Sequence, residues 1–210
     1  MRITSLALAL TLGLEASAVL AQPNLRSTFP GRRIGGGTRG ECAARLLAHL
    51  VPTDSVFAPG ATGTVGLLQG PTAQPRPLQI ELRPNSPGGG SAAAAGASQR
   101  RQFPAAAVEV TLLRLPAVAS PVVWESSYVC AEAGPASTDP LSFVEAVSPP
   151  ALSLLVRETT PKDQAIQASL AKLRGRCGAQ VERTELARSF GLEDVITGPE
   201  WPERIPVRCP

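Results

Sequence analysis

The sequence has few of the side chains that usually build large cores, metal sites or catalytic centres. Aromatic residues make up only 4% of its 210 residues, and there is one histidine, His49. The core must therefore be built from Val, Leu and Ile. No two cysteines have the C-x-x-C spacing of a zinc site, so we expect no metal ion and no cofactor. The G-x-S-x-G motif of a serine hydrolase is also missing.

Strong charge of one sign is missing too. Lys and Arg number 20 and Asp and Glu number 17, which gives a net charge of +3. This excess is too small for the basic stripe of a nucleic-acid-binding protein, so we expect no nucleic-acid partner.

Long hydrophobic runs are absent except for one at the N-terminus. Arg2 precedes the mostly apolar run Ile3–Leu14, and small residues follow it up to Ala21. This order is typical of a secretory signal peptide over 1–21, with cleavage near Ala21-Gln22. The run is shorter than the roughly 20 residues that a membrane span needs, so we expect no transmembrane segment in the mature chain. The expected location is the periplasm or the exterior.

The four cysteines fit an oxidising compartment. An even number of cysteines in an exported chain predicts disulfides, and four cysteines allow three pairings. We favour Cys42–Cys130, which would join the glycine-rich entry to a core strand, and Cys177–Cys209, which would join a helical region to the C-terminal tail.

Several short apolar segments separated by Pro- and Gly-rich turns predict a mainly β fold, an Ig-like β-sandwich over 42–158. The segment 43–51 fits a short helix or a strand. Five further segments fit strands: Thr62–Leu68, Leu78–Arg83, Val108–Leu115, Val122–Cys130 and Leu141–Val147, with Leu152–Arg157 closing the set. The low-complexity stretch 85–102 has almost nothing to bury and predicts a mobile loop or hairpin tip.

The pattern becomes helical after the strands, which predicts a small C-terminal helical appendage over 159–197. Thr160 can cap a helix that starts at Pro161 and ends at Gly175, and a second helix is expected over Val181–Phe190. The prolines after Trp201 predict an extended tail over 198–210, whereas 22–41 is expected to form a flexible, Gly/Arg-rich lead-in.

Several of these segments resemble a secreted cyanobacterial family that is known only as domain of unknown function 928. The first is Pro30–Gly40 followed by Cys42 and Leu50-Val51-Pro52, and the later ones are Trp124–Cys130, Phe143-Val144-Glu145 and Gly191–Val195. The chain departs from the family over Thr53–Gln74, where the family tends to carry an aromatic-rich strand, and its helical part is shorter. The resemblance implies no activity.

One segment suggests ligand binding. Consecutive glycines let backbone N–H groups converge on an anion, and arginine binds phosphate or carboxylate through two parallel hydrogen bonds. The candidate ligand residues are Arg32, Arg33, Gly35, Gly36, Gly37 and Arg39. The alternative is a glycine-rich turn with solvated arginines, and this alternative is favoured.

Other groups give weaker signals for chemistry. His49 lies in an apolar stretch and is interpreted as structural. The acidic residues Glu81, Glu109, Glu125, Glu132, Asp139 and Glu145 offer carboxylates, but nothing in their spacing selects a catalytic pair. Trp124, Tyr128 and Phe143 are interpreted as core aromatics.

The sequence thus favours an exported, non-enzymatic binding or envelope-associated β domain. If it binds a ligand, the hypothesis is an anionic ligand at the Gly/Arg segment, with an envelope polymer or a periplasmic protein as partner. The alternative is a hydrolase that acts on envelope carbohydrate through paired carboxylates.

Overall fold

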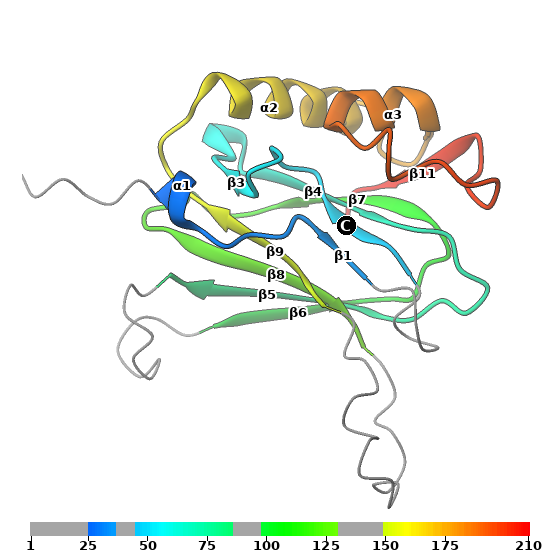
Figure 1. Ribbon diagram of the computed structural model, residues 1–210, viewed down its shortest axis with the longest axis horizontal. Helices are drawn as coiled ribbons and strands as arrows, with labels where there is room; N and C mark the ends of the chain where they lie inside the picture. Colours follow the sequence, from blue (N-terminus) through cyan, green and yellow to red (C-terminus); the bar gives the residue numbers. More distant parts are fainter. Residues whose placement is uncertain (1–24, 37–44, 86–97, 130–148) are drawn as a thin grey trace, which may run out of the picture.

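A computed structural model describes residues 25–36, 45–85, 98–129 and 149–210. Within these ranges the protein is mainly β, with eleven strands in two sheets and three α-helices. The two sheets pack face to face as a sandwich, and α2 and α3 form a further layer on one side (Figure 1). The expected mainly β sandwich with helices near the C-terminus is therefore confirmed.

The first sheet has six strands in the order β1-β2-β4-β7-β11-β10. Its strands are β1 (Ile34–Gly35), β2 (Leu47–His49), β4 (Thr64–Gln69), β7 (Glu109–Arg114), β11 (Arg204–Arg208) and β10 (Gln180–Glu182). All its pairs are antiparallel except β7 with β11. The central strand β4 is buried at every position, because the sheet is covered on both faces.

The second sheet has five strands in the order β3-β9-β8-β5-β6. Its strands are β3 (Val56–Phe57), β9 (Ala151–Leu155), β8 (Val122–Tyr128), β5 (Leu78–Pro84) and β6 (Gln99–Phe103). Alternation along β5 places Leu78 and Ile80 in the core and Gln79 and Glu81 on the outer face, as the sequence pattern predicts.

The helices α2 (Pro161–Arg174) and α3 (Arg183–Phe190) lie along the outer face of the first sheet (Figure 1). Their apolar residues belong to the same core cluster as the sheet, so the helical region is an integral layer of the domain. Gly66 of β4 allows close approach, since a Cβ there would lie 2.8 Å from Cδ2 of Leu170. The expected capping by Thr160 and the end of α2 at Gly175 are both found.

The C-terminal tail differs from the expected extended segment, because five of its residues form β11. This strand lies between β7 and β10, and its buried Ile205 and Val207 join the core. The disulfide Cys177–Cys209, with Cα atoms 5.6 Å apart, fastens the end of β11 to the turn after α2. This pairing is as expected, whereas Cys42–Cys130 lies outside the described residues.

The part of the lead-in that the structure describes, 25–36, is also ordered into elements. The short helix α1 (Leu25–Thr28) precedes Phe29, and both Leu25 and Phe29 pack on a small second cluster made by Val56, Ala58, Val123, Leu154 and Val156. This cluster covers part of the outer face of the second sheet. Arg32 then pairs with Leu152 through two backbone hydrogen bonds of 2.7 and 2.8 Å.

Most of the expected strands are found within a residue or two of the predicted bounds. The strands β1, β3, β6, β10 and β11 were not predicted: β6 includes 99–102 of the expected low-complexity loop and is antiparallel to β5, and β10 takes the first two residues of the helix expected over Val181–Phe190, so that α3 begins at Arg183. The ambiguous segment 43–51 contains strand β2. The signal peptide, the low-complexity residues 86–97 and the expected strand Leu141–Val147 lie outside the described residues.

Candidate functional site

Arg33, the central residue of the anion-site hypothesis, is buried and uses its donors within the fold. Its guanidinium donates to the carbonyl oxygens of Val51, Phe190 and Gly191 at 3.0, 2.7 and 2.6 Å. Burial lowers its pKa. Two of the acceptors lie at the C-terminus of α3, where unpaired carbonyls favour a cation. The side chain therefore connects the residue before β1 to the helical layer. Of the two arginines of this hypothesis that the structure describes, Arg32 is the exposed one.

The two described glycines of the same hypothesis allow close backbone packing. A Cβ on Gly35 would lie within 2.3 Å of the backbone nitrogen of Ala151, and Gly36 has a φ of 91°. The Gly36 N–H donates to the carbonyl of Pro149, so it does not point to a free anion nest. Gly37 and Arg39 lie outside the described residues.

His49 lies in the interior between the two sheets with both ring nitrogens occupied. Nδ1 is 2.8 Å from Oγ of Ser153, Nε2 is 2.9 Å from Oγ of Ser126, and the ring stacks on Trp124. Desolvation lowers the pKa of His49 to about 3, so the ring is neutral near pH 7. The arrangement of His49 between two serine hydroxyls resembles a proton relay. All three side chains are fully buried, however, and this burial fits the structural role expected of the histidine.

The described carboxylates do not form an acid–base pair in a cleft. Glu81 and Glu125 face each other across β5 and β8, and each makes an ion pair, with Arg100 at 3.0 Å and with Arg83 at 3.4 Å. A hydrogen bond from Ser98, followed by one from Arg100, lowers the pKa of Glu81, which opposes its use as a general acid. Glu132, Asp139 and Glu145 lie outside the described residues.

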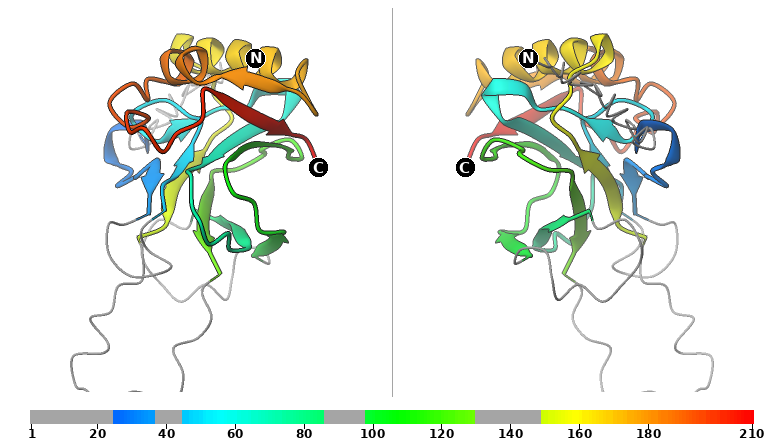
Figure 2. Two further views of the ribbon diagram at one scale, coloured as in Figure 1. Left: turned by 90° about the vertical axis from the view of Figure 1, so that its right-hand side faces the viewer. Right: turned by 90° about the vertical axis from the view of Figure 1, so that its left-hand side faces the viewer.

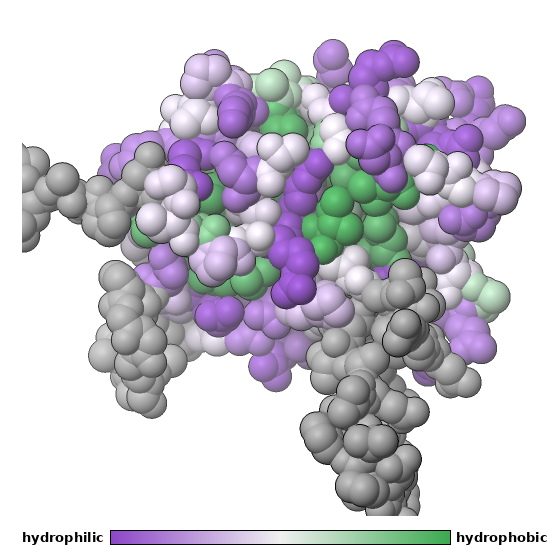
Figure 3. All heavy atoms as spheres, in the orientation of Figure 1, coloured by the Kyte–Doolittle hydropathy of each residue, from purple (hydrophilic) through white to green (hydrophobic). Residues whose placement is uncertain are grey.

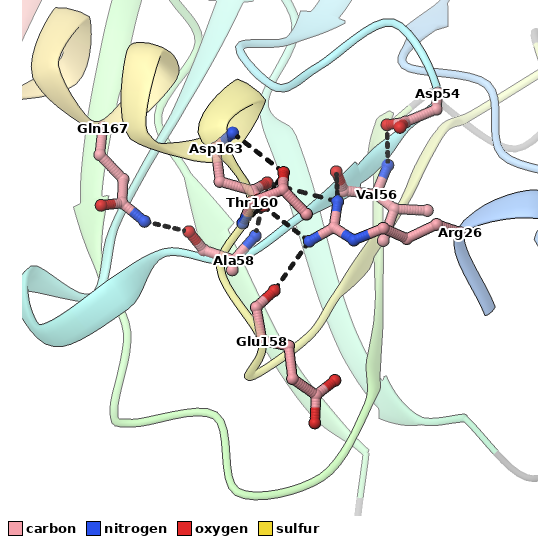
Figure 4. A network of polar contacts seen from close by, with 8 residues as sticks. All are labelled: Arg26, Asp54, Val56, Ala58, Glu158, Thr160, Asp163 and Gln167. Carbon is pink, nitrogen blue, oxygen red and sulfur yellow. Dashed lines mark hydrogen bonds and ion pairs between the residues drawn. The ribbon is translucent and has the colours of Figure 1, made fainter. Parts of the chain in front are cut away.

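Asp163 is the centre of a polar network that joins four segments of the chain (Figure 4). Its fully buried carboxylate accepts hydrogen bonds from Arg26, from the N–H of Ala58, and from the N–H and hydroxyl of Thr160. Arg26 also donates to the carbonyls of Val56 and Glu158. Asp163 lies in the first turn of α2. Because its oxygens are occupied by these donors, we assign it a structural role.

A second buried polar group lies at one end of the space between the sheets. The sequence did not predict that these residues would meet. Glu109 accepts hydrogen bonds from Thr111 at 2.8 Å and from Gln69 at 3.3 Å. Arg45 crosses the ends of β4 and β7, donating to the carbonyls of Gly70 and Ala107. Its guanidinium stacks over the ring of Tyr128, 4.7 Å from the centroid. This group closes one end of the sandwich with polar contacts.

The other end of the sandwich is open and apolar. A cavity of about 250 Å³ lies between β5, the first residue of β8 and the connection 115–120. Its apolar wall is formed by Leu82, Leu115, Val118, Val122 and Leu155, and Arg83 and Gln99 lie at its margin. The right-hand view of Figure 2 looks onto this end of the molecule. We call it the mouth pocket.

The mouth pocket is the best candidate site among the described residues, because it combines concavity and apolar walls with a charged residue, Arg83, at its lining. The Arg83 side chain is 46% exposed and lies on the outer face of the sheet, where it meets Glu125 in a single 3.4 Å ion pair, which is a weak contact in solvent. Elsewhere the surface is mixed, and in Figure 3 an apolar area lies below α3 among hydrophilic residues. Sequence missed the pocket because its walls come from strands and a connection distant in sequence.

No cluster of three or more potential metal ligands occurs among the described residues. No helix in the described ranges has the length and apolar character needed to cross a membrane. Comparison of the chain with protein-family models, with curated proteins and with solved structures gives no match.

Proposed function

We propose that the chain is an exported, non-enzymatic binding domain, and that its ligand places an apolar group in the mouth pocket and a negative charge beside Arg83. The single observation that carries this proposal is the open, apolar cavity of about 250 Å³ with Arg83 at its margin. Ligand sites are typically concave and mostly apolar, with a few polar groups that fix orientation.

The size of the pocket limits the ligand group that enters it. A water molecule occupies roughly 30 Å³ in the liquid, so the cavity has room for about eight non-hydrogen atoms. An apolar group of this size gives at most modest affinity, with a dissociation constant of about micromolar to millimolar. Arg83 adds selectivity for an anion over a cation.

Three observations support binding rather than catalysis. His49 is fully buried between Ser126 and Ser153, and the opposed Glu81 and Glu125 are each paired with an arginine. Neither group borders the mouth pocket. Export is supported by the apolar N-terminal run and by the disulfide Cys177–Cys209, which is compatible with an extracytoplasmic location.

Calorimetric titration with octanoate and with octyltrimethylammonium tests the proposal. Octanoate is expected to bind saturably and more tightly than the cation of equal chain length. Val118→Trp, which fills the pocket, should abolish binding, and Arg83→Gln should remove the preference for the anion. Arg204→Gln is the matched control, because Arg204 also makes an exposed ion pair, with Glu182, but lies on the other sheet. Equal binding by Val118→Trp and the unsubstituted chain would refute the proposal.

A further inference from the structure

The strand beside the mouth pocket is an edge strand. β6 ends the order of the second sheet, and among the described residues no strand pairs with its outer side. Residues 99–102 of this strand are all exposed. An exposed edge offers a row of backbone N–H and C=O groups to which an extended chain can add.

The edge strand β6 lies next to the mouth pocket, and the inner face of this strand is on the same side of the sheet as the pocket. Gln99 of β6 borders the mouth pocket and pairs with Leu82, which forms part of the pocket wall. Arg101 pairs with Ile80, a core residue, so Arg101 and Gln99 share the inner face of the strand. A strand added beyond β6 would place every second side chain on this face, with one of them opposite Gln99 and close to the pocket.

The positive charge of β6 determines which kind of strand can pair with its free edge. Two adjacent arginines, Arg100 and Arg101, occupy the exposed strand, and Arg83 lies at the pocket margin. In the full-overlap antiparallel pairing of two copies, Arg101 would face the Arg101 of the second copy, and like charges directly opposite are destabilising. Arg100 already pairs with Glu81 at 3.0 Å, so Arg101 makes the main contribution to favouring a strand with acidic residues at the facing positions.

From this edge, pocket and charge we infer that the ligand is an extended acidic peptide segment that adds antiparallel to β6 and inserts an apolar side chain into the mouth pocket. In the partner, two consecutive acidic residues face Arg101 and Arg100, and the apolar residue that follows them faces Gln99. The inference rests on the proposed function, because the same pocket receives the apolar group. Backbone hydrogen bonds to β6 supply the additional affinity.

Titration with synthetic peptides tests this assignment on the intact mature chain. The probe is an eight-residue, capped peptide rich in Thr and Val, in which an acidic pair precedes a leucine. Successive N–H groups of a strand point to opposite sides, so N-methylation of alternate residues blocks one edge at a time. One of the two N-methylated peptides should lose binding and the other should keep it. Equal effects of both modifications would overturn the inference.

Charge exchange supplies an independent readout. Arg101→Glu should weaken binding of the acidic peptide by roughly tenfold, and a peptide with lysine in place of only the acidic residue that faces position 101 should recover it. Arg188→Glu is the control, because Arg188 is an exposed arginine of α3, on the helical layer. Failure of the lysine peptide to recover binding to the Arg101→Glu variant would contradict the assigned pairing.

The two proposals fail in different ways. If octanoate binds and no peptide competes with it, the peptide assignment is wrong and the pocket remains a site for a small anionic ligand. If neither octanoate nor peptide binds, both proposals are wrong. A concentration-dependent dimer that Arg101→Glu alters would identify a second copy of the chain as the occupant and would also overturn the inference.

Discussion

His49 and Trp124 stack nearly parallel across the two sheets, with ring centroids 3.6 Å apart and an interplanar angle of 9°. The histidine comes from β2 and the tryptophan from β8, so the stack joins one sheet to the other. Ser126 and Ser153 hold the imidazole by its two nitrogens. In a chain with only 4% aromatic residues, this group joins the two sheets through a ring stack and two side-chain hydrogen bonds.

The burial of His49 predicts a loss of stability in mild acid. Its pKa is about 3 in the folded state and near 6.5 in the unfolded state, so between these values only the unfolded chain binds the extra proton. The free energy of unfolding should therefore fall as pH drops below about 6.5, by up to about 1.4 kcal/mol per pH unit from this group. Chemical denaturation between pH 6.5 and 5 measures the slope.

NMR titration gives the control for that measurement. His49 is the only histidine, so its ring resonances need no assignment by mutation. They should stay at their neutral positions down to pH 5 in the folded protein and titrate normally in denaturant. Protonation of the folded ring near pH 6.5 would show that the imidazole is not sealed between the sheets.

Arg33 and its neighbour Arg32 should respond very differently to the same substitution. Arg33→Gln removes three hydrogen bonds to backbone carbonyls, leaves buried acceptors unpaired, and should lower the free energy of unfolding by about 2–4 kcal/mol. Arg32→Gln changes an exposed side chain and should alter stability by less than about 0.5 kcal/mol. Thermal or urea unfolding checks both. Similar small effects would mean that Arg33 is not part of the core.

This pair also shows where sequence reasoning reached its limit. The residues Arg32-Arg33 followed by glycines look like a solvated anion site, because one sequence does not reveal which arginine turns inward. Periodicity predicted strands such as Leu78–Arg83, which is found as Leu78–Pro84, and capping residues predicted the helix after Thr160, since these signals are local. It missed β6 and β11, whose pairing depends on distant partners, and it gave no sign of the mouth pocket.

Asp163 should be among the most sensitive positions of the chain. Asp163→Asn removes the charge that Arg26 contacts at 2.7 Å and places an amide where four donors converge. Breaking such a buried pair typically costs about 3–5 kcal/mol of stability. Urea unfolding at neutral pH measures the loss, with the exposed Asp194→Asn as control. Equal midpoints for the two variants would contradict the role assigned to this network.

Removal of the disulfide should weaken the end of the first sheet that is formed by β10 and β11. The bond closes a loop with a sequence separation of 32, for which chain entropy predicts a stabilisation of about 3–4 kcal/mol. Replacement of Cys177 and Cys209 by Ser should lower the unfolding midpoint accordingly, and hydrogen exchange should rise first in β10 and β11. Uniform exchange across both sheets would instead indicate that β11 is held by its pairing with β7 alone.

The most direct test of the account is an NMR titration of the isotopically labelled mature chain with octanoate. Saturable shift changes are expected at β5, at the start of β8 and along 115–120, with little change in α2, α3 or β10. Shifts that never saturate, or that centre on the helical layer, would contradict the placement of the ligand site at the open end between the two sheets.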